Sequence, residues 1–245
     1  AQSSVRGHNI VRMKPMRVIL AALCALLLSL TPAASAEADP DPARAAADRL
    51  VAAMGGAEAW SRAHGLIIRA RHWETSIDAP YENLIQMSFD EPRMRFDGDS
   101  ATMIRRRAIA NGAGWRVSEL RELSPMTLEQ VANDLKWWEA HAYRNIGRLA
   151  RKDPTITPRL AADGRLELYR PDGVRLMWYR LTPAGEPVAF GAWDNEQGSV
   201  FGPLIERGGG IKLPAWATSA DGAFRAILVE ATALPAAPAA DWSKP

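Results

Sequence analysis

The longest regular hydrophobic pattern in the chain lies between Thr127 and Leu149. Apolar residues recur there at steps of three or four, and at about 100° per residue they fall on one narrow stripe of an α-helix. The stripe consists of Leu128, Val131, Leu135, Trp138, Ala142, Ile146 and Leu149. Thr127 is followed three residues later by Gln130, which is the spacing of a capping box. The pattern therefore predicts one long amphipathic helix from Thr127 to Leu149.

Trp137 does not fit this stripe. It lies about 180° from Leu128 on the helical wheel, among polar residues such as Asn133 and Arg144. A tryptophan on the polar face of a helix needs a cover for its ring. The sequence leaves three kinds of cover open: a loop of the same chain, a bound ligand or a partner protein.

Shorter patterns on either side of this segment predict a small helix and many strands. Asp41-Pro42 is a good start for an Ala-rich helix over 43–54. From Gly65 the period changes to two, and strands are expected over 66–75, 83–90, 93–96, 102–110 and 114–120. After the central helix, Asp-Gly and Pro-containing turns separate short runs of residues. Such spacing favours antiparallel hairpins, because parallel crossovers need about a dozen residues or more. These elements predict one α+β domain.

Two segments of the C-terminal half have distinctive patterns. Residues 174–181 are apolar on both alternating faces, which predicts a strand that is covered on both sides. Residues 234–245 are rich in Ala and Pro and are expected to form a flexible tail, with no evident neighbour for Trp242.

The N-terminal residues predict export from the cytoplasm. A short basic region with Lys14 and Arg17 precedes an apolar run over 18–30, and Ala34-Ser35-Ala36 forms a cleavage site before Glu37. This is the pattern of a secretory signal peptide, and the apolar run is too short to span a membrane. We expect upstream sequence and a cleaved leader over 1–36, a single domain over 37–233 and a location in the periplasm. No later run of the sequence is long enough for an integral membrane segment after cleavage.

Cleavage also changes the charge and cysteine content. The leader holds four basic residues and no acidic ones, which leaves 26 basic and 28 acidic residues in 37–245, a net charge of −2. A nucleic-acid partner is not expected, because it would need a dense basic field. The only cysteine, Cys24, lies in the leader, so the mature chain has neither a disulfide nor a thiol nucleophile.

The order of elements resembles that of a known superfamily. A signal peptide precedes an Ala-rich helix and the segment Ala-Met-Gly-Gly-Ala-Glu-Ala-Trp at 53–60, which leads into strands, an internal helix and a longer meander. In this respect the chain is similar to the periplasmic lipoprotein-carrier superfamily, which includes LolA/LolB-like and outer-membrane lipoprotein-sorting proteins. The resemblance implies a curved antiparallel sheet that forms an unclosed half-barrel, with helices on its concave side. It also implies an apolar cavity that holds acyl chains or another hydrophobic ligand.

Catalytic and metal-binding motifs are not evident in the sequence. His64, His72 and His141 form no spaced pair such as H-E-x-x-H, and no G-x-S-x-G elbow is present. A Ser-His-Asp triad could still be assembled from distant residues. We expect no cofactor, no metal and no enzymatic activity.

The candidate ligand-binding residues are mainly aromatic and Met side chains. Nine tryptophans in the mature chain are unusually many, and Met re-packs around variable chains. In the run Arg105-Arg106-Arg107, the side chain of Arg106 points to one face of a strand and its two neighbours point to the other. An arginine at the rim of a cavity could bind an anionic group. The candidates are Met87, Phe89, Met103, Arg106, Trp115, Trp137, Trp138, Met177 and Trp178.

The sequence favours a periplasmic carrier or sensor that binds a hydrophobic ligand, a lipid or a lipoprotein acyl chain, without covalent chemistry. The alternative is a module that binds another envelope protein through a sheet edge or through the Trp137 face. An enzyme that uses one of the histidines is a third reading.

Overall fold

The structure, a computed structural model, describes residues 41–100, 104–117 and 121–243. The expected leader over 1–36 and the candidate Met103 lie outside these residues. The helices are α2 Pro42–Ala53, α3 Ala57–Ser61, α4 Leu128–Glu139 and α5 Ala142–Ala150. The strands are β1 Gly65–Glu74, β2 Tyr81–Ser88, β3 Met94–Asp99, β4 Ile104–Ala110, β5 Ala113–Val117, β6 Leu123–Pro125, β7 Thr157–Leu160, β8 Leu166–Tyr169, β9 Arg175–Leu181, β10 Pro187–Ala192, β11 Ser199–Phe201, β12 Leu204–Glu206, β13 Lys212–Pro214, β14 Trp216–Ser219 and β15 Phe224–Leu234.

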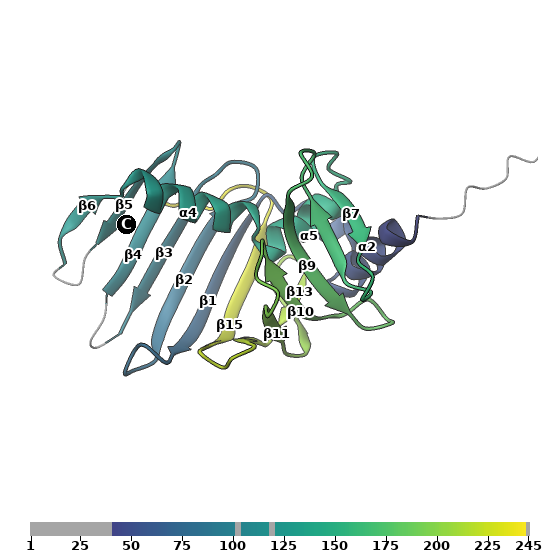
Figure 1. Cartoon of the computed structure of the whole chain (residues 1–245). Helices are drawn as coiled ribbons and strands as arrows, with labels where there is room; N and C mark the ends of the chain where they lie inside the picture. Colours follow the sequence, from purple (N-terminus) through teal and green to yellow (C-terminus); the bar gives the residue numbers. More distant parts are fainter. Residues whose placement is uncertain (1–40, 101–103, 118–120, 244–245) are drawn as a thin grey trace, which may run out of the picture. The chain divides into compact units, whose positions relative to one another are not determined.

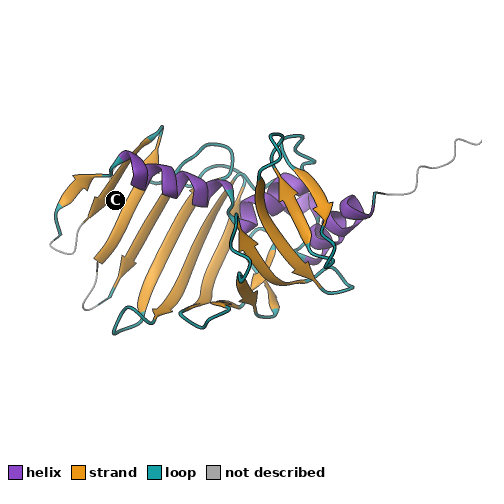
Figure 2. Cartoon of the chain, in the orientation of Figure 1, coloured by secondary structure: helices purple, strands orange, loops and turns teal. Residues whose placement is uncertain are grey.

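One large antiparallel sheet dominates the fold (Figures 1 and 2). Its 13 strands run in the order β6-β5-β4-β3-β2-β1-β15-β14-β11-β10-β9-β8-β7. The terminal strands β6 and β7 do not pair with each other, so the sheet is not closed into a barrel. Strands β12 and β13 form a separate hairpin. The prediction of an α+β half-barrel is therefore confirmed.

In the middle of the sheet, the first strand of the chain lies beside the last one. Strand β1 pairs with β2 on one side and with the last strand, β15, on the other. On one side of this pair lies a simple meander, β1 to β6, and on the other side lie β14 and the hairpins of the C-terminal half. The helix α4 runs across the face of the β1–β5 meander (Figure 1).

The central helical segment consists of two helices, so the prediction of one continuous helix was wrong. The capping box at Thr127 and Gln130 is present, but α4 ends at Glu139 and His141 adopts an extended conformation before α5. The buried amide of Asn145 donates to the carbonyl oxygens of Glu139 (3.0 Å) and His141 (3.3 Å). A continuous helix would pair the Glu139 carbonyl with a backbone N–H four residues later. The side chain of Asn145 replaces that backbone donor and lets the chain turn.

Because the segment is broken into two helices, its buried residues differ from those of the predicted apolar stripe. Leu128, the first residue of the predicted stripe, is exposed, whereas nearly all of α5 is buried, including Arg144 and Arg148. The Trp138 indole N–H donates to the Ser88 carbonyl oxygen at 2.7 Å, which anchors the end of α4 to β2.

Two other expectations for the elements are confirmed. The side chain of Asp41 caps α2 by accepting a hydrogen bond from Ala43 N (3.0 Å). Strand β9 is buried on both faces, as its continuous apolar sequence predicted. Among the residues that the structure describes, no helix is both long and apolar enough to cross a membrane.

Candidate functional site

The sheet and the two central helices enclose a cavity of about 580 Å³. Its walls come from β1–β4, β10, β11, β14 and β15, and from the α4–α5 segment. Most of the lining side chains are apolar, among them Ile68, Ile85, Phe96 and Leu228. The exposed members of the lining lie where it meets solvent and are Arg105, Asn133, Lys136 and Trp137. The cavity is therefore an apolar space with a polar and aromatic rim.

The alternation of strand side chains sets the composition of this wall. Because successive residues point to opposite faces, Ile68, Ala70, His72 and Glu74 of β1 all face the cavity. On β3, Gly98 packs beside the Tyr81 ring, and a Cβ atom there would lie 3.3 Å from the Arg105 carbonyl oxygen.

Four polar side chains form a chain of hydrogen bonds along this wall. Arg105 Nη1 donates to Glu74 Oε1 at 3.0 Å, and the Tyr81 hydroxyl donates to the same oxygen. His72 Nδ1 lies 3.2 Å from the Tyr81 hydroxyl. Burial lowers the pKa of His72 to about 4, and burial together with the bond to Glu74 raises the pKa of Tyr81 above its ordinary value. Both groups are therefore uncharged near neutral pH.

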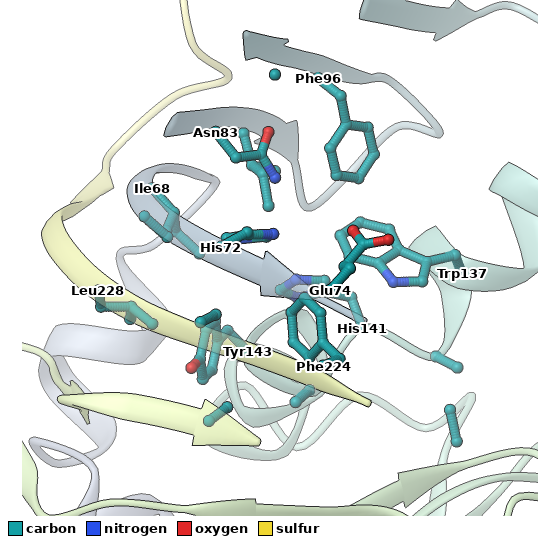
Figure 3. A pocket seen from close by; sticks show the side chains of 18 of the residues that line it. Ile68, His72, Glu74, Asn83, Phe96, Trp137, His141, Tyr143, Phe224 and Leu228 are labelled. Carbon is teal, nitrogen blue, oxygen red and sulfur yellow. The ribbon is translucent and has the colours of Figure 1, made fainter. Parts of the chain in front are cut away.

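A row of aromatic rings leads from β3 of the sheet to the α4–α5 segment (Figure 3). The Trp137 ring contacts Phe96 of β3 and His141, with centroids 5.0 Å and 4.5 Å apart, and His141 in turn lies 5.4 Å from Tyr143. His141 Nδ1 is buried and has no hydrogen-bond partner among the described residues. Burial lowers the pKa of His141 to about 3, so this imidazole is also neutral.

The described residues contain no group of three or more His, Cys, Asp or Glu side chains placed to hold a metal ion. The cationic side chains of the lining are engaged with other groups of the chain. Arg105 is paired with Glu74, Arg107 donates to Asp134 at 2.8 Å, and Lys136 Nζ lies 5.3 Å from the centre of the Trp193 ring.

Comparison with known proteins gives no family for this chain. No family model and no curated protein sequence matches it. Solved structures with some similarity include a DUF1329 family protein from Desulfovibrio piger, with 9% identity and a TM-score of 0.37, covering 79% of this chain and 93% of that one. An uncharacterized conserved protein from Thermus thermophilus has 11% identity and a TM-score of 0.33, covering 84% of this chain and 94% of that one. Similarity at this level supports no inference about function.

Of the nine candidate residues from the sequence, Trp137 lines the cavity. Its position on the polar face of α4 is explained by the wall of rings that it joins. Five other candidates are buried in the core outside the lining: Met87, Phe89, Trp138, Met177 and Trp178. Met87 lies on the same face of β2 as Asn83 and Ile85, but at the end of the strand where the packing is dry.

The remaining candidates lie elsewhere. Arg106 points away from the cavity and pairs with Asp99, whereas its neighbours Arg105 and Arg107 line the wall. Trp115 lies at a separate depression with Trp242, beside the C-terminal tail. Met103 is outside the described residues.

Several side chains of the site were not among the candidates. They are His72, Glu74, Tyr81, Asn83, Arg105, Arg107, His141, Tyr143, Phe190, Phe201 and Phe224. The period of two along a strand could have shown that Tyr81, Asn83 and Ile85 share a face. It could not have shown that this face lines a cavity.

Proposed function

We propose that the protein is an exported carrier or sensor that binds a hydrophobic ligand in the cavity between α4, α5 and the sheet, without covalent chemistry. The observation that carries this proposal is the cavity itself. Its volume of about 580 Å³ lies within the usual range of ligand pockets, roughly 300–1,000 Å³. Its apolar wall gives affinity by burial, about 0.8 kcal/mol for each methylene group removed from water. The resemblance of the sequence to periplasmic lipoprotein carriers points to a lipid or an acyl chain.

Export rests on the leader pattern that ends at Ala34-Ser35-Ala36. Cleavage there would leave Glu37 as the first residue. N-terminal sequencing of the protein recovered from a periplasmic extract tests this part, and an uncleaved chain retained in the cytoplasm would refute it.

Native mass spectrometry of protein purified without detergent tests the binding function. We expect a lipophilic adduct that is retained on the wild-type protein and is reduced several-fold in Trp137→Ala. Trp115→Ala is the matched control, because Trp115 is 36% exposed, Trp137 is 37% exposed, and only Trp137 lines the cavity. An adduct-free protein that also fails to bind an added lipophilic fluorescent probe would overturn the proposal.

The alternative is an interaction module that binds another envelope protein through a sheet edge or through the Trp137 face. The contacts of that ring with Phe96 and His141 favour ligand binding instead. If Trp137→Ala released a co-purifying protein while the lipid content stayed unchanged, the interaction module would be the better account.

A further inference from the structure

We infer that the cavity selects a lipid whose polar end is an uncharged hydroxyl group, recognised by His72 and Asn83. This inference rests on the proposed function and specifies the ligand class for the same site. It follows from the direction of the hydrogen bonds along the wall, which leaves His72 Nε2 free to accept a hydrogen bond, and from the amide group of Asn83 beside it.

The carboxylate of Glu74 determines which groups donate and which accept in this chain of hydrogen bonds. A carboxylate only accepts hydrogen bonds, so Glu74 accepts from both Arg105 and Tyr81. The single hydroxyl proton of Tyr81 is thereby used, and its oxygen can only accept from His72. His72 must therefore carry its proton on Nδ1, and Nε2 is left with a lone pair. Nε2 has no partner among the described residues, yet it is not enclosed by protein atoms.

The His72 ring cannot easily turn to reverse this arrangement. It is 7% exposed and lies between Tyr81 of β2 and Phe224 of β15, each with its ring centroid 5.1 Å away. These two residues come from the strands on either side of β1. The acceptor is thus held in position before a ligand arrives, which reduces the entropic cost of binding.

Asn83 supplies the second polar group. It lies two residues from Tyr81 on the same face of β2, and the register of β1 with β2 places it diagonally next to His72. It is 6% exposed, and its side chain forms no hydrogen bond within the described part of the chain. Figure 3 shows Asn83 and His72 together between Ile68 and Phe96. The Asn83 amide group lines the cavity and is open to a hydrogen bond from a ligand there.

A hydroxyl group complements this pair. It can donate to His72 Nε2 and accept from Asn83 Nδ2 at the same time. A carboxylate has no proton for Nε2, and the arginines of the lining are already paired with Glu74 and Asp134. The chemistry therefore fits a long-chain alcohol, or a larger lipid that ends in a hydroxyl group, better than a free fatty acid.

Affinity measurements with 1-dodecanol and its methyl ether test the inference, because the two probes differ in the hydrogen-bond donor. Competition against a fluorescent lipophilic probe gives the two dissociation constants. We expect the alcohol to bind about three- to tenfold more tightly to the wild-type protein, the usual contribution of one buried hydrogen bond. His72→Phe should retain binding but bring the ratio to about one.

Tyr81→Phe provides a second test that keeps the His72 ring. Without the phenol oxygen His72 can move its proton to Nε2, so we expect the preference for the alcohol to fall and the affinity for dodecanoate to rise at pH 8. Equal affinities of the wild-type protein for alcohol and ether would overturn the inference and leave the proposed function standing. Failure of both probes to bind would overturn the proposed function, and the inference with it.

Discussion

At the scale of single residues, the two histidines of the cavity form part of its wall and also lower the stability of the protein at acidic pH. His72 and His141 are both neutral, because burial disfavours the imidazolium form. A neutral imidazole can accept a hydrogen bond inside an apolar space, but the unfolded chain can protonate the same group at mildly acidic pH. The stability of the protein is therefore linked to pH through these residues.

We predict that His72→Phe reduces the acid sensitivity of folding. The pKa of His72 is about 4 in the folded protein and near its ordinary value of 6.5 in the unfolded chain. As pH falls from 6.5 to 4, His72 binds a proton in the unfolded state but not in the folded state, so the free energy of unfolding decreases. The shift corresponds to roughly 3 kcal/mol at pH 4, and none of this loss is present above pH 6.5.

Urea denaturation of the wild type and the variant at pH 7.5 and pH 4.5 measures this effect. His64→Gln is the control, because His64 lies at the surface beside Asp90 (2.8 Å) and outside the cavity. That variant leaves His72 unchanged, so it should keep the acid sensitivity that His72 causes. An equal loss in His72→Phe would contradict the assignment of this cost to His72.

At the scale of elements, local sequence signals predicted most of what the structure contains. The caps at Asp41 and Thr127 and the buried strand over 174–181 were read from neighbouring residues, and local interactions determine them. The break at His141 was missed because it depends on the Asn145 side chain, which binds two carbonyl oxygens only after the chain has turned. A helical wheel shows only the angular positions of side chains, so it cannot show that a side chain will replace a backbone donor.

The helix α4 is attached to the sheet by few interactions besides Trp138. Its ion pair with β4 joins Arg107 and Asp134 at 2.8 Å, and both side chains are largely shielded from solvent. We predict that Asp134→Asn weakens this attachment, lowers the free energy of unfolding by about 1 kcal/mol and speeds ligand release several-fold. Stopped-flow displacement of a bound lipophilic probe measures the release rate.

The exposed pair of Arg106 and Asp99 on the other face of β4 is the matched control for this experiment. Exposed ion pairs contribute little, so Asp99→Asn should change neither the stability nor the release rate appreciably. Equal release rates in both variants would show that α4 does not control access to the cavity.

At the scale of the whole domain, the site depends on pairings that no local pattern contains. Strand β1 lies against β15, more than a hundred residues later in the chain, and the cavity wall combines side chains from both. The sequence identified which residues of a strand share a face, as for Ile85 and Met87, but not which part of that face would stay unfilled. The large apolar residues chosen as ligand contacts, such as Met177 and Trp178, fill the dry core instead.

The central place of β15 leads to a last prediction, on two shortened chains. Ending the chain after Leu234 removes the tail, which contacts the sheet through Gly65 and through a hydrogen bond from Arg95 to the Asp241 carbonyl oxygen (3.2 Å). We expect this chain to fold with a modest loss of stability. Ending it after Ala223 removes β15 and exposes the edges of β1 and β14 in the middle of the sheet. That chain should aggregate or lack cooperative unfolding, as circular dichroism and gel filtration would show. If it unfolded cooperatively as a monomer, the two halves of the sheet would be independent units, and the cavity wall between them would not require β15.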